Sequence, residues 1–194
     1  MMTRFLPLLA LAAATALTAC SENAARFPVE TAPATASAAP VRLRVATIEL
    51  RDVVLPAYAE DSQMQLRNAE GALVTLEGAQ WAAPSAQAMT AELARGLDLG
   101  STASVAAEPW PLSEPAQMRL DVRIDRLLPG EDGRLEMGGQ FAVSSPDLVV
   151  REFIERFDIT VPLAADPVTP AALAAAHGAA LSQLRDRILT RLAR

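Results

Sequence analysis

The sequence of 194 residues contains one cysteine, one histidine and no lysine. A single cysteine excludes an internal disulfide and a cysteine-based metal site. The chain also lacks a Gly-rich phosphate loop and a GxSxG nucleophile elbow. The histidine, His177, lies on the apolar stripe of a predicted helix, which favours a packed side chain. We therefore predict that the protein is not an enzyme and holds no metal ion or non-covalent cofactor. A hydrolase that uses His177 with Ser144 or Ser145 is the weaker alternative.

Positive charge and aromatic residues are both in short supply. Arginine supplies all 17 basic residues against 23 acidic ones, and the formal net charge is −6. Nucleic-acid partners need clustered cations, so this balance argues against them. Aromatic residues make up 4% of the chain, so aliphatic side chains must fill most of the core. The length fits a single domain.

The N-terminus reads as a secretory signal. Arg4 is followed by a mostly apolar run from Phe5 to Leu17, which suits a signal peptide and is shorter than the roughly 20 residues that cross a bilayer. The run ends in Leu17-Thr18-Ala19-Cys20, which matches the lipobox of bacterial lipoproteins. We therefore expect residues 1–19 to be removed and Cys20 to carry covalent lipid such as palmitate. That lipid would anchor the chain to a membrane.

The residues after Cys20 predict location and domain organisation. Ser21 stands where the usual sorting rule requires aspartate for inner-membrane retention, which favours the periplasmic face of the outer membrane. We expect a lipidated tether over residues 20–25 and one periplasmic domain over 26–194. Residues 31–40, TAPATASAAP, predict a flexible segment. This segment is a loop inside the domain if Arg26-Phe27-Pro28-Val29 pairs as a strand, and otherwise it extends the tether.

From residue 41 onward, alternating apolar and polar residues predict mostly β-structure. The pattern is clearest at 118–128, where apolar side chains alternate with arginine and aspartate. Turns at 129–133 and 145–147 then predict an antiparallel meander of three strands with one apolar and one charged face. The expected strands cover residues 41–50, 63–67, 72–77, 118–128, 135–143 and 149–161.

Two amphipathic helices are predicted. The first begins at Pro84 and ends near Gly96. The second has Thr169 as its N-cap and Pro170 at its first position, and its apolar stripe continues to Leu192. Together the elements predict an α+β fold, a mainly antiparallel sheet with two helices packed on one face.

Tyr58, Trp81 and Trp110 are candidate contact residues for a partner. Each lies close to a proline, which is typical of ordered loops at a domain edge. Tryptophan and tyrosine are frequent anchors of interfaces. The alternative is that the tryptophans fill the core, because the chain has few other large rings.

Several short motifs together suggest a family. The lipobox is followed by VRLRVATIEL, by Leu55-Pro56-Ala57-Tyr58, by Gln80-Trp81-Ala82-Ala83-Pro84 and by Glu108-Pro109-Trp110. In this order and spacing they resemble the ABC-type transport auxiliary lipoproteins of the PqiC or YmbA type, over residues 26–194.

The resemblance implies a role without catalysis. Such lipoproteins act as outer-membrane docking subunits of ABC/MCE-type systems that move lipids between membranes. The expected partners are an MCE-domain protein and further copies of the chain, since some members form rings. The alternative function is a periplasmic carrier that binds lipid in an internal pocket, for which a cavity between helices and sheet would speak.

Overall fold

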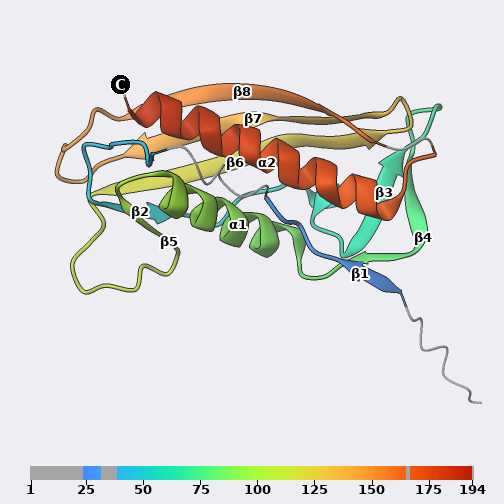
Figure 1. Cartoon of the computed structure of the whole chain (residues 1–194), viewed down its shortest axis with the longest axis horizontal. Helices are drawn as coiled ribbons and strands as arrows, with labels where there is room; N and C mark the ends of the chain where they lie inside the picture. The colour runs from blue at the N-terminus through green and yellow to red at the C-terminus, as the bar shows by residue number, and fades with distance from the viewer. Residues whose placement is uncertain (1–23, 32–38, 165–166, 194) are drawn as a thin grey trace, which may run out of the picture.

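The computed structural model describes residues 24–31, 39–164 and 167–193. Within them the chain forms eight strands, two α-helices and one 3₁₀ helix, which is an α+β architecture (Figure 1). The predicted signal peptide and Cys20 lie outside the described residues. In chain order the elements are β1 (Ala25–Phe27), β2 (Thr47–Leu50), η1 (Ala57–Ala59), β3 (Gln63–Arg67), β4 (Leu73–Trp81), α1 (Ser85–Gly100), β5 (Ser104–Ala107), β6 (Met118–Gly130), β7 (Arg134–Ser144), β8 (Phe153–Pro162) and α2 (Pro170–Leu192).

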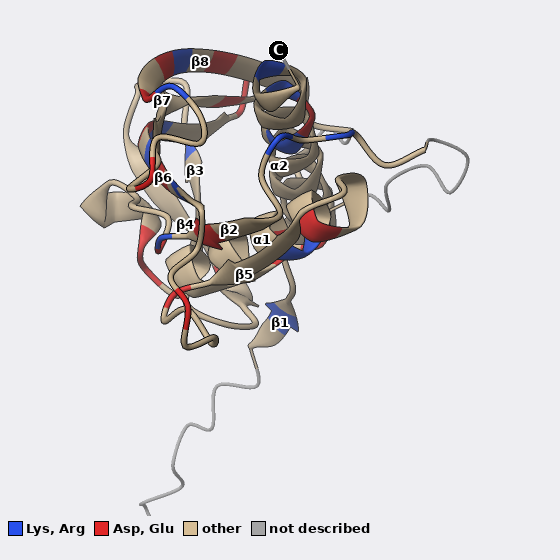
Figure 2. Cartoon of the chain, turned by 90° about the vertical axis from the view of Figure 1, so that its left-hand side faces the viewer, with Lys and Arg blue, Asp and Glu red and all other residues tan. Residues whose placement is uncertain are grey.

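The long strand β6 is the centre of a forked sheet. On one side it pairs along its length with β7, which pairs with β8. On its other side two short branches meet it. β2 pairs with its beginning and carries β5, whereas β3 meets its end at Gly130 and carries β4 and β1. The end view shows the strands curving around the two helices (Figure 2).

The predicted antiparallel sheet is confirmed only in part, because the sheet is mixed. The pairs β3–β4, β6–β7 and β7–β8 are antiparallel, but β1–β4, β2–β5, β2–β6 and β3–β6 are parallel. Alternation along a strand indicates which side chains are buried, and it carries no information on the direction of the neighbouring strand. Parallel neighbours need a long crossover, and the chain between β2 and β5 includes a hairpin and α1.

The predicted meander is confirmed as β6, β7 and β8. Along β6 the side chains of Met118, Leu120, Val122 and Ile124 are buried, and the arginines and aspartates between them are exposed. The hairpin of β3 and β4 is also confirmed. β8 begins at Phe153, four residues later than predicted, because residues 145–152 form a hydrogen-bonded loop.

Both predicted helices form. α2 begins as expected, and Thr169 Oγ1 accepts a hydrogen bond from the backbone N–H of Ala172 at 3.2 Å. α1 continues four residues beyond Gly96 to Gly100 and buries Leu97 completely. Both helices lie on the same side of the strands in Figure 1, and they contact each other. No helix in the described part of the chain has both the length and the apolar content to cross a membrane.

The segment 24–31 is part of the fold. β1 pairs in parallel with β4, which places Phe27 beside Trp81, and Val29 is buried. Thr31 donates its N–H and its hydroxyl to Glu92 Oε2 of α1, at 3.1 and 2.9 Å. The chain is fixed to the domain again at Val41, which bridges to Ser101. The predicted flexible segment is therefore held at both ends, and its residues 32–38 lie outside the described residues.

Gly178 tests how this N-terminal segment is held. A Cβ atom at this position of α2 would overlap the backbone carbonyl of Glu30. We expect Gly178→Ala to destabilise the domain by about 1–3 kcal/mol, because overpacking outweighs the gain of up to ~1 kcal/mol in helix propensity. Chemical denaturation measures the change. Gly96→Ala is the matched comparison, since there the new atom meets side-chain atoms of Arg185 and no backbone. Equal stability of Gly178→Ala and wild type would contradict the prediction.

Candidate functional site

β2 and β3 pair with the two ends of β6 and leave its middle without a neighbouring strand on that side. The segment that contains Tyr58 runs along this middle part. The N–H of Val54 donates to Val122 O at 3.0 Å, and the N–H of Ile124 donates to Val54 O at 2.9 Å. Further along, the N–H of Leu127 donates to Tyr58 Oη at 3.2 Å. Tyr58 thus adds a side-chain acceptor to the backbone hydrogen bonding of β6, and the residue is partly exposed.

Trp81 ends β4 and is buried, with 8% of its surface exposed. Its ring meets the imidazole of His177 edge-on, with centroids 4.8 Å apart and an interplanar angle of 62°. Together with Tyr58 and Met89 these two side chains line a pocket of about 30 Å³, which has room for one or two water molecules. Little of Trp81 is left for a partner, and its role as a contact residue stays a prediction.

His177 is buried in α2, and its Nδ1 lies 2.9 Å from the carbonyl oxygen of Leu173. A carbonyl only accepts, so Nδ1 carries the proton. Burial lowers the pKa of His177 to about 4, against the opposing effect of this hydrogen bond. The imidazole is therefore neutral near pH 7. Ser145, a candidate partner for it, instead donates its hydroxyl to Gln117 O at 2.8 Å. Among the described residues no three His, Cys, Asp or Glu side chains gather as metal ligands.

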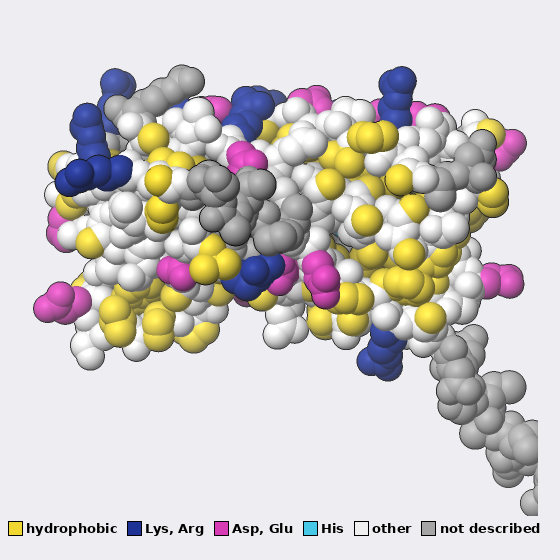
Figure 3. Space-filling view, in the orientation of Figure 1, with side chains coloured by type: hydrophobic (Ala, Val, Ile, Leu, Met, Phe, Trp, Pro, Cys, Tyr) yellow, Lys and Arg dark blue, Asp and Glu magenta, His cyan; other side chains and the backbone are white. Residues whose placement is uncertain are grey.

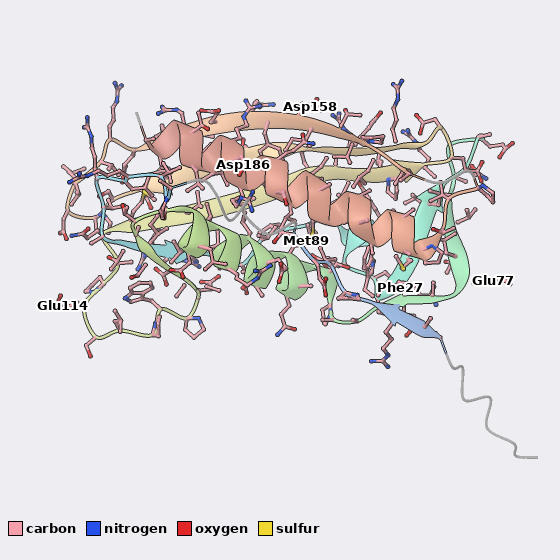
Figure 4. All side chains as sticks on the ribbon, in the orientation of Figure 1. Phe27, Glu77, Met89, Glu114, Asp158 and Asp186 are labelled. Atoms are coloured by element: carbon pink, nitrogen blue, oxygen red, sulfur yellow. The ribbon has the colours of Figure 1, made fainter. Side chains whose placement is uncertain are left out.

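Trp110 lies in the loop between β5 and β6 and is partly exposed. Its Nε1–H donates to the carbonyl oxygen of Glu114 at 2.8 Å. Figure 4 shows Glu114 at one end of the molecule and Phe27, the neighbour of Trp81, at the other. The structure therefore brings Tyr58 and Trp81 to one pocket and does not bring Trp110 to them.

A groove that was not predicted from the sequence lies at the end of the molecule where α2 finishes. Its lining comes from the chain before β2, from the loop that leads into β8, and from the last turn of α2. Arginine side chains gather at this end, on the left of Figure 3. Three segments that are distant in the sequence line the groove. The sequence signal for it was the presence of an arginine in each of them.

Residues 29–189 match the family described as the ABC-type transport auxiliary lipoprotein component. The chain belongs to this family. The resemblance inferred from the motifs is thereby confirmed, and the protein is a lipoprotein component auxiliary to a transport system. None of the curated proteins compared with the chain matches it.

Solved structures with TM-scores above 0.6 share this fold at low sequence identity. Protein XCC0632 from Xanthomonas campestris, of family DUF330, has a TM-score of 0.69 at 18% identity, covering 87% of this chain and 95% of that one. An uncharacterised protein has a TM-score of 0.63 at 15% identity, covering 79% and 95%. The PelC dodecamer from Paraburkholderia phytofirmans has a TM-score of 0.45 at 13% identity, covering 76% and 92%.

The buried imidazole makes stability depend on pH. The pKa of His177 is about 4 when folded and 6.5 in the exposed reference state, so unfolding takes up a proton between these values. Stability should therefore fall as the pH drops from 6.5 to 4, by up to roughly 3 kcal/mol from this residue alone. Denaturation curves of wild type and His177→Phe between pH 7 and 4.5 isolate the effect. Identical pH slopes would contradict it.

Tyr58→Phe removes the acceptor of the Leu127 N–H and keeps the ring. We expect a loss of about 1–2 kcal/mol in the free energy of unfolding, since a strand N–H is left without its partner. Guanidinium denaturation measures the loss. Trp110→Phe serves as the control, because its indole bond lies in a more exposed loop where water replaces it. The prediction fails if both variants unfold at the same denaturant concentration.

Proposed function

We propose that this lipoprotein is the outer-membrane docking subunit of an ABC/MCE-type system for intermembrane lipid transport. Cys20 carries the lipid anchor, the domain lies in the periplasm, and the role is non-catalytic. The observation that carries the proposal is the family match over residues 29–189, which makes the chain an auxiliary component of a transport system. The lipobox supports attachment to a membrane, and Ser21 supports the periplasmic face of the outer membrane.

The attachment of β1 gives this proposal an orientation. Four peptide steps join Cys20 to Ala24, the residue before β1, and they span at most about 14 Å. A lipid on Cys20 would therefore hold the β1 end of the domain next to the membrane. The opposite end, with residues 108–117 and 145–152, would face the periplasm and the partner. Trp110 and the exposed Leu112 belong to that end.

The alternative, a carrier with an internal lipid pocket, has less support. The pocket between the helices and the sheet, lined by Trp81, Met89 and His177, has a volume of only about 30 Å³. Ligand pockets are typically about 300–1,000 Å³. The largest core side chains, among them Phe141, Met137 and Met118, are fully buried. A docking role needs no such cavity.

Self-association is part of the proposal. β5 and β8 end the sheet on two sides, and within the described residues no strand pairs with their outer edges. Strand edges offer hydrogen-bonding groups to a further copy. Part of each edge is already bonded, since Val105 N donates to Asp98 Oδ1 and Arg156 O accepts from Arg187 Nη2. The charges along β8, including Glu155, Arg156 and Asp158, favour a polar contact between copies over an apolar one.

Native capture of the lipoprotein from detergent-solubilised envelopes tests the docking role. We expect mass spectrometry of the captured material to identify an MCE-domain protein. Trp110→Ala with Leu112→Ala should lower its recovery about tenfold, the effect of losing ~1.4 kcal/mol at an anchor residue. Val74→Ala, at an exposed position of β4, is the control. Recovery of the lipoprotein alone, together with bound lipid, would reject docking and favour the carrier.

A further inference from the structure

The groove near the end of α2 has the size and composition of a ligand site. It is lined by Arg44, by residues 149–153, and by Arg191 and Leu192, and its volume is about 640 Å³. That volume lies within the usual range for small-molecule sites, about 300–1,000 Å³. Val149, Val150, Phe153 and Leu192 give it an apolar surface, and Arg44, Arg151 and Arg191 give it cations.

Two of the three arginines have no ion pair. Arg191 lies over the ring of Phe153, 3.8 Å from its centroid, and its Nε is 2.9 Å from Glu155 Oε2. Arg44 and Arg151 are exposed and form no ion pair with any carboxylate among the described residues. The carboxylate in the lining, Glu152, accepts a hydrogen bond from Ser145 N at 3.1 Å. The groove thus presents two guanidinium groups that form no ion pair among the described residues, beside the single carboxylate of Glu152.

The wall of the groove is held in place before any ligand arrives. Ser145 is 1% exposed, and its hydroxyl donates to Gln117 O at 2.8 Å and accepts from Val149 N at 3.1 Å. Its carbonyl accepts from the N–H of Leu148 at 2.9 Å, which lies in the left-handed region at φ 53°. A preformed wall avoids the entropy cost of ordering a loop on binding.

We propose that this groove binds the anionic head and the first part of the acyl chain of a single-chain or two-chain amphiphile. Arg44 and Arg151 would hold the head, because guanidinium groups bind phosphate and carboxylate with parallel hydrogen bonds. The apolar floor would accept the methylene groups beside it. Charge complementarity supports an anion here, since Arg44 and Arg151 place unpaired guanidinium groups in the lining of a chain whose net charge is −6. This goes beyond docking, because the domain itself would contact lipid.

Calorimetric titration of the full mature chain, made without lipid by Cys20→Ser, tests the site. The probes are dodecyl phosphate and dodecanoate below their micelle concentrations, with dodecyl maltoside and inorganic phosphate as controls. We expect both anionic amphiphiles to bind at one site, and both controls to bind at least about tenfold more weakly, as expected when each half of the ligand contributes. The ranking of the two anionic probes separates a phosphate-bearing lipid from a fatty acid.

The double variant Arg44→Ala, Arg151→Ala should weaken dodecyl phosphate binding by about tenfold or more. Arg134→Ala, another exposed arginine with no ion pair among the described residues, should bind like wild type. The proposal is overturned if the double variant binds unchanged, if dodecyl maltoside binds equally well, or if inorganic phosphate alone binds equally well. These outcomes are independent of capture of an MCE-domain protein, so the docking role stands or falls separately.

Discussion

The backbone of β6 imposes the constraint on which the rest of the fold depends. This strand has 13 residues, but on its inner side β2 and β3 pair only with its beginning and its end. A buried N–H without a partner costs about 1–3 kcal/mol, so the gap has to be filled. The segment from Val54 to Tyr58 fills it with backbone bonds and with the phenol oxygen. The same segment leads directly into β3, and so into the branch that receives β1.

The motifs by which the family can be recognised serve this architecture. Leu55 is buried, and Tyr58 accepts a hydrogen bond from a backbone N–H of β6. Trp81 closes β4 over His177 before α1 begins. Glu108 accepts from Asp52 N at 2.8 Å and pairs with Arg51, which joins the ends of β2 and β5. These residues stabilise the fold. They therefore identify the family, but they do not indicate where a partner or a ligand binds.

Local features were predictable from the sequence, and relations between distant segments were not. The Thr169 cap, the alternation along β6 and the meander each depend on neighbouring residues or short turns. The parallel pairing of β2 with β5 and β6 depends on a crossover, which no periodicity reports. The groove was missed for the same reason: Arg44, Arg151 and Arg191 come from three segments that only the fold brings together. The burial of Trp81 against His177 also depends on segments that are distant in the sequence. The sequence therefore left open whether Trp81 contacts a partner or fills the core.

A rigid connection between β1 and the helices would let an anchor at one end orient the groove at the other. Thr31 is held by Glu92, whose carboxylate also receives Arg95 Nη2 at 2.7 Å. The hydrogen bond from Arg95 and those from Thr31 keep the pKa of Glu92 below its usual range despite partial burial, so the contact stays ionised at neutral pH. Gly178 lets Glu30 pass directly over α2, the helix whose last turn carries Arg191 and Leu192. The N-terminal segment is bound to both helices. If the domain tilts relative to its anchor, β1 and the groove would therefore move together. The position of the groove above the membrane would then follow from the fold and not from the length of a flexible linker.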